Sequence, residues 1–330
     1  MIDASIIIVN WNTKDYLLQC LESLILETNR CNIEIIVVDN GSTDGSPETV
    51  KERFRNVRLI QNRDNLGFAK ANNIGIRQSS GRYICLLNSD MKVLEGCIDR
   101  MVTYMDQNRS IGVLAPKILN PDMTTRFDCR EFPTIWNTFC RALGLHKIFP
   151  RNRFFSDYIM WYFPHNSIRS IDYVAGCFLM VRKSAIDEVD LLDENFFMYA
   201  EDKDWCKRLR EAGWDVVFYP YAEAIHHAGA SSARSPNKLL IERLRSNLYY
   251  WEKHHSKLAQ ITFFGLLLFH HTLRVVGSAI AYSIRPSQRV KYAATLTGHI
   301  ACLRWLTNNI LFRIRQKVKI PGFSFEKTDN

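Results

Sequence analysis

The chain has 330 residues, of which 47% are hydrophobic and 23% charged, so it can bury a full core and is not an intrinsically disordered protein. Its nine cysteines are odd in number and form no Cys-x-x-Cys pair, which argues against a disulfide framework or a zinc site and favours reduced core cysteines. The net charge of +9 is unevenly distributed. Residues 241–330 contain 14 Lys and Arg but only 4 Asp and Glu, whereas residues 1–240 contain 29 Lys and Arg and 30 Asp and Glu. The excess positive charge therefore lies in the C-terminal region.

The N-terminal third alternates short β-branched apolar runs with helical runs, a pattern typical of an α/β sheet flanked by helices. Strands are predicted at residues 4–9, 33–38, 57–61 and 82–87. Helices are predicted after the capping residues Asn12 and Thr13, at Ser46 with Pro47 behind it, and over residues 68–78. The first residues, Met-Ile-Asp, place an acid where an export signal carries basic residues, so no signal peptide is predicted.

Polar or glycine-rich sequence follows each of these four strands. The stretches are Asn10-Trp11-Asn12, residues 39–46, residues 62–68 and Asn88-Ser89-Asp90. Ligands of open parallel sheets bind beyond the carboxyl ends of the strands, so we expect a binding crevice at this edge. No GxGxxG follows the first strand and no GxxxxGK[ST] occurs, which argues against a nicotinamide enzyme or a P-loop NTPase.

The middle of the chain is less regular. Residues 116–170 are rich in Arg, aromatics and Pro and predict irregular structure with short helices. A strand is predicted at 172–181, a helix opens near Glu201, and a strand at 215–219 precedes a loop that holds His226.

Three acids, Glu201, Asp202 and Asp204, lie in the first turn of that helix. Carboxylates there are stabilised by the unpaired N–H groups and the helix dipole, so a helix cap is the competing interpretation of any catalytic role. Two other polar residues also have both a functional and a structural interpretation. Asp39 could accept a hydrogen bond from a pyrimidine imide or serve as a turn residue, and His226 could ligate a metal or be structural. Asp90 could hold a divalent cation with phosphate oxygens and water completing the shell.

The basic tail contains a long apolar segment at residues 261–284, interrupted by His270, His271 and Arg274. A helix that crossed a membrane would have to desolvate these residues, so helices lying on an anionic membrane surface fit better, and two core helices packed on the domain are the alternative. Nucleic-acid binding is not predicted, because the tail lacks a recognised fold or an aromatic-basic stacking motif.

Seven stretches, in order, resemble glycosyltransferase family 2, the inverting nucleotide-sugar transferases of the GT-A fold, and within it the rhamnosyltransferase-like branch. They are IIVNWN (7–12), VVDNGSTDGS (37–46), NLGFAKANN (65–73), LLNSD (86–90), GCFLMVR (176–182), FFMYAED (196–202) and HHAGAS (226–231). The resemblance covers residues 4–232 and fades in 116–170 and in the tail. It implies a Rossmann-like mixed α/β sheet flanked by helices, with a C-terminal helical, membrane-associating tail.

The resemblance also implies a donor site. Asp39 would read the pyrimidine base against a wall formed by Val9, Asn10 and Trp11. Further donor contacts would come from Asn65, Gly67, Asn72, Ser89 and Asp90. The missing Cβ of Gly67 would let the backbone approach the nucleotide closely.

Metal and catalytic roles are implied as well. Asp90 matches the last acid of the family's metal motif and His226 a histidine directed at the metal or diphosphate, so Mg²⁺ or Mn²⁺ is expected. Asn88 departs from a full Asp-x-Asp, which predicts weaker binding on that side. Asp202 resembles the catalytic base, which we expect to stay ionised at a helix start, with Glu201 as its supporting neighbour and Asp204 as a plain cap.

The resulting hypothesis is an inverting enzyme that transfers L-rhamnose from a dTDP donor to a lipid-linked or cell-surface glycan. A UDP-sugar (galactofuranose or hexose) transferase and a non-catalytic nucleotide-sugar binding protein are the alternatives. We expect a GT-A domain over 1–235, divided into a nucleotide-binding half (1–115) and an acceptor and catalytic half (116–235), and a helical basic-amphipathic region over 236–330. The expected location is cytoplasmic, peripheral on the inner face of the plasma membrane.

Overall fold

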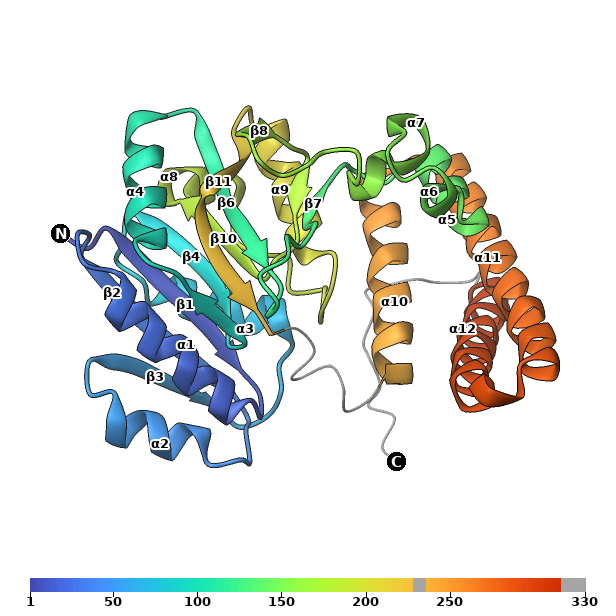
Figure 1. The fold of residues 1–330 in the computed structure, drawn as a ribbon, viewed down its shortest axis with the longest axis horizontal. Coiled ribbons are helices and arrows are strands. Elements are labelled where there is room, and N and C mark those ends of the chain that lie inside the picture. The colour runs from blue at the N-terminus through green and yellow to red at the C-terminus, as the bar shows by residue number, and fades with distance from the viewer. Residues whose placement is uncertain (228–235, 316–330) are drawn as a thin grey trace.

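The computed structural model describes residues 1–227 and 236–315, so residues 228–231 of the last family-like stretch and the end of the basic tail lie outside it. A mixed sheet flanked by helices forms one part of the molecule, and a pair of long helices lies at the other end beyond α10 (Figure 1). The strand order is β3-β2-β1-β4-β10-β6-β11-β5, with β8 paired to β11. The expected mixed α/β architecture is therefore confirmed.

The strands of the main sheet are β1 (Ala4–Asn10), β2 (Ile33–Asn40), β3 (Val57–Asn62), β4 (Tyr83–Asn88), β5 (Met91–Val93), β6 (Ile111–Leu119), β8 (Arg169–Ser170), β10 (Phe178–Arg182) and β11 (Asp215–His226). Two short strands, β7 (Cys129–Arg130) and β9 (Tyr173–Val174), form a separate pair. The helices before β11 are α1 (Lys14–Glu27), α2 (Ser46–Arg53), α3 (Phe68–Arg77), α4 (Cys97–Gln107), α5 (Ile135–Leu143), α6 (Leu145–Ile148), α7 (Arg153–Ser156), η1 (Asp157–Ile159), α8 (Lys183–Val189) and α9 (Glu201–Glu211). After it come α10 (Pro236–His254), α11 (Lys257–Ile284), η3 (Pro286–Gln288) and α12 (Arg289–Arg315).

Alternate residues of each strand face opposite sides of the sheet, and each side has its own apolar core. Ile6 and Ile8 pack in one cluster with side chains of α1, α2 and α4. Ile7 packs in the other, with side chains of α3, α8 and α9, including the fully buried Trp205. This two-sided burial explains why the strands are nearly continuous apolar runs.

The parallel pairing of β1, β2, β3 and β4 brings their polar carboxyl ends into line. Asn10 lies opposite Asp39, Asp39 opposite Gln61, and Val9 opposite Asn88. The chain winds from β1 toward β3 on one side and places β4 on the other, so the order reverses beside β1. Ligand crevices form at such a switch point.

Several sequence expectations need correction. The run at 172–181 is two strands in different sheets, β9 and β10, because the chain turns at Ala175–Cys177. The strand β6 was missed because Pro116 interrupts its pattern, yet the proline lies opposite the irregularity between Tyr219 and Glu223, where the ladder is broken anyway. Since β6 spans the 115/116 boundary, the two expected halves share a strand.

Two local expectations also differ from the structure. The strand β11 continues to His226, which pairs with Met91 of β5, so this histidine lies at a strand end and not in a loop. The helix α2 begins at Ser46 itself, with Gly45 as its N-cap.

The helix α9 is fastened to α10 by a buried charge cluster around Asp204. The Asp204 carboxylate is fully buried and lies 2.9 Å from Arg208 Nε, 2.8 Å from Lys253 Nζ and 2.7 Å from His254 Nε2. Burial alone would raise its pKa, but hydrogen bonds from His254 and Lys253 and the charge of Arg208 lower that pKa to about 2. Asp204 is therefore an interhelical ion-pair partner, and the expectation of a plain cap was wrong.

The turn before α9 is held by α10 as well. Tyr199 and Ala200 both have positive φ, 70° and 69°, which is uncommon for residues with a Cβ. Ser246 donates a hydrogen bond to the Met198 carbonyl at 2.7 Å, and the Arg243 guanidinium lies 4.6 Å from the Tyr199 ring centre. These contacts offset the cost of the strained turn.

Gly67 lies where α3 meets the same turn. Its φ is +86°, and a Cβ there would lie 2.4 Å from the Phe197 carbonyl oxygen, while the next residue, Phe68, donates its N–H to that oxygen at 2.6 Å. Gly67 is therefore required by a close approach of the protein's own backbone, and its expected contact with a nucleotide stays a prediction.

We predict that Gly67→Ala destabilises the fold more than Gly213→Ala, measured by urea unfolding. Both glycines have positive φ, but nothing lies within 4 Å of a Cβ at Gly213, so that control isolates the conformational cost of roughly 1–2 kcal/mol. The clash at Gly67 should add about 1–3 kcal/mol. Equal losses of unfolding free energy in the two variants would show that the turn at Phe197 rearranges at no cost to make room for the added methyl group.

We predict that Asp204→Asn lowers the free energy of unfolding by about 2–3 kcal/mol near neutral pH, because it removes the buried charge that pairs with the partly exposed Arg208 and Lys253. Because the folded pKa lies below the unfolded one, the stabilisation is present above about pH 4 and is lost as the pH falls toward 2, so wild type and variant should converge on acidification. Asp187→Asn is the control: its carboxylate, paired with Lys183, is 60% exposed, and its loss should cost at most about 1 kcal/mol. A similar small loss at Asp204 would contradict the role given to the cluster.

Candidate active site

The carboxyl ends of β1 and β2 carry a connected set of buried polar groups. Asn10 donates from its amide nitrogen to Asp39 Oδ1 at 2.9 Å, and the Ser42 N–H donates to Asp39 Oδ2 at 3.0 Å. The same Asn10 amide reaches Ser46 Oγ at 2.8 Å. Asn10 is fully buried and Asp39 is 2% exposed, so the two residues form a rigid pair. Val9 and Trp11 are half-buried beside them.

A second contact crosses the switch point between β1 and β4. The Thr13 hydroxyl donates to Asn10 Oδ1 at 2.8 Å and lies 2.7 Å from Ser89 Oγ. Thr13 does not cap α1 with its side chain; the Asp44 carboxylate does so, by accepting the Lys14 N–H at 2.9 Å. Ser89 is thereby joined to the Asn10–Asp39 pair, which extends the site to the residue before Asp90.

The asparagine side chains of the NLGFAKANN stretch (65–73) form hydrogen bonds to other parts of the protein. Asn65 accepts from the Asn40 amide at 2.9 Å and from the Gly67 N–H at 3.0 Å, and Asn72 donates to the Phe68 carbonyl one turn back in α3. Asn73, which the sequence did not single out, bonds both the N–H and the carbonyl of Leu192. In this structure the stretch ties α3 and the 190s loop to the end of β2.

Asp90 and His226 meet at the end of the paired strands β5 and β11. His226 Nε2 lies 3.1 Å from Asp90 Oδ1, and the His227 N–H donates to the Asp90 carbonyl at 2.9 Å. Asp128, which the sequence missed because it lies in the irregular segment before β7, belongs to the same cluster. One ligand atom each from Asp128, Cys177 and His226 lies within 4.8 Å of the others, and all three residues are buried.

These residues fit a divalent cation. The Nε2 atom of His226 faces the Asp90 carboxylate at 3.1 Å, so a cation between these two side chains would bind this nitrogen. Carboxylates of Asp90 and Asp128 are the hard oxygen donors that Mg²⁺ and Mn²⁺ favour, whereas the Cys177 thiol is a poor partner for them. Arg126 lies 3.1 Å from Asp128 and adds a positive charge at the rim.

Asp202 is held by the GCFLMVR stretch. The Gly176 N–H donates to Asp202 Oδ2 at 2.7 Å, and the Lys203 N–H donates to Oδ1 at 2.7 Å. A Cβ at Gly176 would lie 3.1 Å from the Asp202 Cβ, so a larger residue would press on the acid. Gly176 therefore both permits and directs the position of this carboxylate.

Burial sets the protonation of the two neighbouring acids. It raises the pKa of Glu201 well above its usual value, and the adjacent Asp202 charge adds to the effect. It also raises the pKa of Asp202, although the N–H groups of Gly176 and Lys203 oppose the shift. That Asp202 stays ionised at the helix start remains a prediction, and the two N–H groups are the contacts that favour its charged form. Glu201 takes up the proton most readily, which leaves Asp202 as the acid of the pair that can act as a base.

Short contacts connect the two parts of the site. The Cys177 carbonyl accepts the N–H of Asn88, two residues from Asp90, at 2.9 Å, and the Cys177 thiol lies 3.9 Å from Asp128 Oδ2. Gly176, the residue before Cys177, holds Asp202. The turn at 176–177 therefore places the candidate base beside the candidate metal ligands, although 112 positions separate Asp202 from Asp90 in the sequence.

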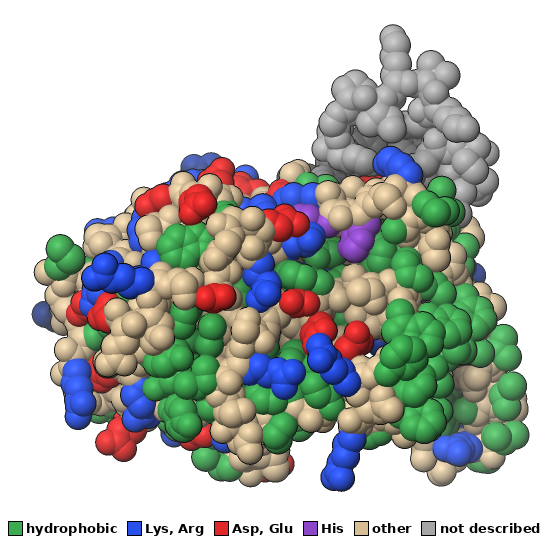
Figure 2. Space-filling view, turned by 90° about the horizontal axis from the view of Figure 1, so that it is seen from above, with side chains coloured by type: hydrophobic (Ala, Val, Ile, Leu, Met, Phe, Trp, Pro, Cys, Tyr) green, Lys and Arg blue, Asp and Glu red, His purple; other side chains and the backbone are tan. Residues whose placement is uncertain are grey.

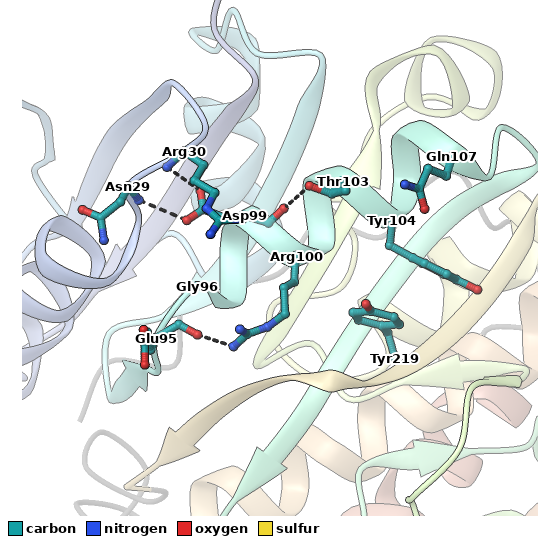
Figure 3. Close-up of a pocket in the computed structure, with 10 residues that line it drawn as sticks. All are labelled: Asn29, Arg30, Glu95, Gly96, Asp99, Arg100, Thr103, Tyr104, Gln107 and Tyr219. Carbon is teal, nitrogen blue, oxygen red and sulfur yellow. Dashed lines mark hydrogen bonds between the residues drawn. The ribbon is translucent and has the colours of Figure 1, made fainter.

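A separate surface hollow of about 410 Å³ lies beside α4 (Figure 3). Its carboxylate Asp99 accepts the backbone N–H groups of Asn29, Arg30 and Cys31, and its Tyr104 stacks on Tyr219 at 4.4 Å. The hollow contains none of the predicted site residues, and two of its charged groups, Asp99 and Arg100, already bond backbone groups of the protein. We therefore locate the site at the strand ends.

Solved structures support the fold. The mannosyltransferase PcManGT from Pyrobaculum calidifontis, determined in complex with GDP-Man and Mn²⁺, superimposes with a TM-score of 0.53 at 14% identity, over 96% of this chain and 88% of its own. At that identity the likeness shows a common GT-A fold and no more.

Sequence comparisons are more specific. N-acetylglucosaminyl-diphospho-decaprenol L-rhamnosyltransferase of Mycobacterium tuberculosis is 32% identical over 262 residues, which are 76% of this chain and 84% of the relative. Rhamnosyltransferase WbbL of Escherichia coli is 26% identical over 255 residues, 74% of this chain and 91% of its own. The model of the family described as glycosyl transferase family 2 matches residues 5–189. Together with the site geometry, these matches show that the chain is a glycosyltransferase and belongs to glycosyl transferase family 2.

Proposed function

We propose that this enzyme transfers L-rhamnose from dTDP-rhamnose to a lipid-linked or cell-surface glycan, with inversion at the anomeric carbon. The observation that carries the proposal is the connected site, in which Asp39, Asp90 and Asp202 are all buried or half-buried at one edge of the sheet. The rhamnosyltransferase relatives supply the choice of sugar, and the mycobacterial relative's name supplies the class of acceptor.

The donor would lie along the strand ends. Asp39 would accept the imide N–H of thymine or uracil, since Asn10 and the Ser42 N–H hold its two oxygens in place. The sugar would then extend across Ser89 toward Asp202. Arg126 at the rim would help to neutralise the diphosphate.

Asp202 is the proposed base. It takes the proton of the acceptor hydroxyl as that oxygen bonds to the anomeric carbon, while the bond from this carbon to the diphosphate oxygen breaks and its electron pair leaves with the nucleotide. Attack opposite the leaving group inverts the centre. Glu201, kept neutral by its raised pKa, leaves the negative charge on Asp202.

A divalent cation, Mg²⁺ or Mn²⁺, would be held by Asp90, Asp128 and His226, and when bound it would stabilise the charge on the departing diphosphate. The Asp128 carboxylate lies within 4.8 Å of a His226 ring nitrogen, and His226 Nε2 lies 3.1 Å from the Asp90 carboxylate; these contacts support the assignment. Asn88 contributes no carboxylate at the position where a full Asp-x-Asp has one, so water would complete that side.

We also propose that the enzyme is cytoplasmic and lies on the inner face of the plasma membrane. The helix α11 is long and apolar enough to cross a membrane by length and composition. However, its exposed aliphatic and phenylalanine side chains follow one stripe with spacings of three or four residues or their multiples, and of the exposed large apolar residues of α11 Tyr282 lies off it; such a stripe suits a helix lying in the interface. The residues of the stripe are Leu258 (76% exposed), Ile261 (70%), Phe269 (45%), Leu273 (42%), Val276 (51%), Ile280 (56%) and Ile284 (68%).

The neighbouring α5–α7 segment enlarges this surface. Its α5 packs against α11, and Ile148, Phe149 and Phe154 are exposed nearby along the chain. Hydrophobic side chains gather at this end of the molecule (Figure 2). Exposed Arg285, Arg289 and Lys291 at the α11–α12 turn provide the charge that anionic lipids attract.

The assay measures transfer of labelled rhamnose from dTDP-rhamnose to N-acetylglucosaminyl-diphospho-decaprenol, with UDP-galactofuranose and UDP-hexoses as competing donors. We predict that Asp202→Asn lowers kcat by about 10²–10⁴-fold, since a general base is lost. Glu201→Gln should stay within about tenfold of wild type, because Gln imitates a neutral carboxyl. Isothermal titration should show unchanged dTDP binding in both.

Each alternative gives a distinct result. Transfer from UDP-sugars alone would overturn the rhamnose assignment, and dTDP-rhamnose binding without any transfer would favour a non-catalytic binding protein. A loss in Glu201→Gln as large as that in Asp202→Asn would contradict the division of roles between the two acids.

We predict that the double change Ile261→Glu and Ile280→Glu weakens binding to anionic vesicles by roughly tenfold or more, because two apolar side chains no longer enter the interface. Sedimentation with vesicles of phosphatidylglycerol and phosphatidylcholine gives the measurement. Ile25→Glu with Leu26→Glu is the matched control, since these side chains on α1 are 52% and 69% exposed. Full retention of binding by the α11 variant would oppose the proposal, as would wild-type resistance to alkaline carbonate extraction.

A further inference from the structure

Three histidines meet between α11 and α12, far from the site described above along the chain. His270 and His271 are neighbours on α11, and His299 comes from α12. One ring nitrogen from each lies within 4.8 Å of the other two. The Nδ1 atoms of His271 and His299 are 2.8 Å apart, and the three ring centres are separated by 5.1 to 5.9 Å.

The surroundings keep these imidazoles neutral. Burial lowers the pKa of His270 to about 4 and of His271 to about 3, and it also lowers the pKa of His299. The guanidinium of Arg274 contributes to the shifts at His270 and His299, and Arg141 of α5 to that at His270. Neutral imidazole is the form that binds metals, so near neutral pH the cluster has its ligand lone pairs available.

The His271 and His299 Nδ1 atoms share one proton in a hydrogen bond. A neutral imidazole carries one N–H, so at 2.8 Å one Nδ1 donates and the other accepts. A metal ion bound to both Nδ1 atoms would displace this proton, and the donor ring would take up a proton at Nε2 by exchange with water, so that both rings stay neutral with their hydrogen on Nε2. The Ala142 backbone of α5 lies beside His270 and opposes the lowering of its pKa by burial.

We propose that His270, His271 and His299 form a binding site for a zinc-class dication that joins α11 to α12. Three imidazoles and a water would complete the tetrahedral shell of Zn²⁺ at Zn–N distances of about 2.0–2.1 Å. In such a shell the ligand nitrogens are roughly 3.3 Å apart, so the rings need only small rotations from their present positions.

Through Ala142, the same site reaches α5, and a bound ion would fix α5, α11 and α12 together. This is the end of the molecule that carries the exposed apolar stripe of α11. The nearby Arg274 opposes a dication, so we expect weaker binding than at a closed four-ligand zinc site. The site is chemically distinct from the cluster at Asp90, because it offers nitrogen donors and no carboxylate.

Co²⁺, which has visible absorption bands in tetrahedral nitrogen sites, tests the proposal on the full-length protein, with Zn²⁺ as competitor. The background variant Asp90→Asn with His226→Asn removes the other candidate metal site. In that background we expect one Co²⁺ per chain with tetrahedral bands that Zn²⁺ abolishes. His271→Gln with His299→Gln, added to the background, should lower the affinity at least tenfold.

His255→Gln is the matched control. His255 is another buried histidine with a pKa lowered to about 4, but it stacks on Trp251 at 3.9 Å and is not part of the histidine cluster. It should bind Co²⁺ as the background does. Thermal unfolding with Zn²⁺ and with chelator gives a second readout: Zn²⁺ should raise the melting temperature of the background and of His255→Gln, but not that of the His271 and His299 variant.

Two results would overturn the proposal. One is the absence of a tetrahedral Co²⁺ spectrum in the background variant. The other is unchanged Co²⁺ affinity after His271→Gln and His299→Gln in a chain that still unfolds cooperatively. Neither result bears on sugar transfer, so the histidine site and the proposed activity stand or fall separately.

Discussion

The hydrogen bond from the Gly176 N–H to the Asp202 carboxylate is the contact on which the arrangement of the site depends. This bond joins α9, which carries the acids, to the turn between β9 and β10. The same turn is bonded to the end of β4, because the Cys177 carbonyl accepts the Asn88 N–H. Without it, the candidate base would have no fixed position relative to Asp90. Because Gly176 has no side chain, the acid can lie directly against the backbone that holds it.

The helix α10 stabilises the position of α9 and therefore this contact. The helix α10 holds the strained turn at Tyr199 and Ala200 and neutralises the buried Asp204, so it fixes both the start and the inner face of α9. The following helices, α11 and α12, pack on one another and on α10 and α5. The surface that we propose to contact lipid is therefore joined, through α10, to the helix that carries Asp202.

The protonation of the site follows from burial and pairing. Glu201 and Asp202 share a poorly solvated position in which one negative charge is tolerated more easily than two, and the backbone N–H groups at Asp202 decide where that charge resides. At the opposite side, His226 lies close to Asp128 and Cys177 and 3.1 Å from Asp90. In the proposed mechanism the first group moves a proton and the second holds a cation.

The sequence by itself determined the elements whose signals are local. Short apolar runs predicted β1 to β4, and the polar residues that follow them predicted which edge of the sheet carries the candidate site, because parallel strands align their carboxyl ends. Only the tertiary structure decided that Asp128 joins the cluster, that Asp204 is an ion-pair partner, that Gly67 serves the Phe197 backbone and that His226 ends a strand. These features depend on contacts between residues distant along the chain, and no local periodicity or spacing encodes such contacts.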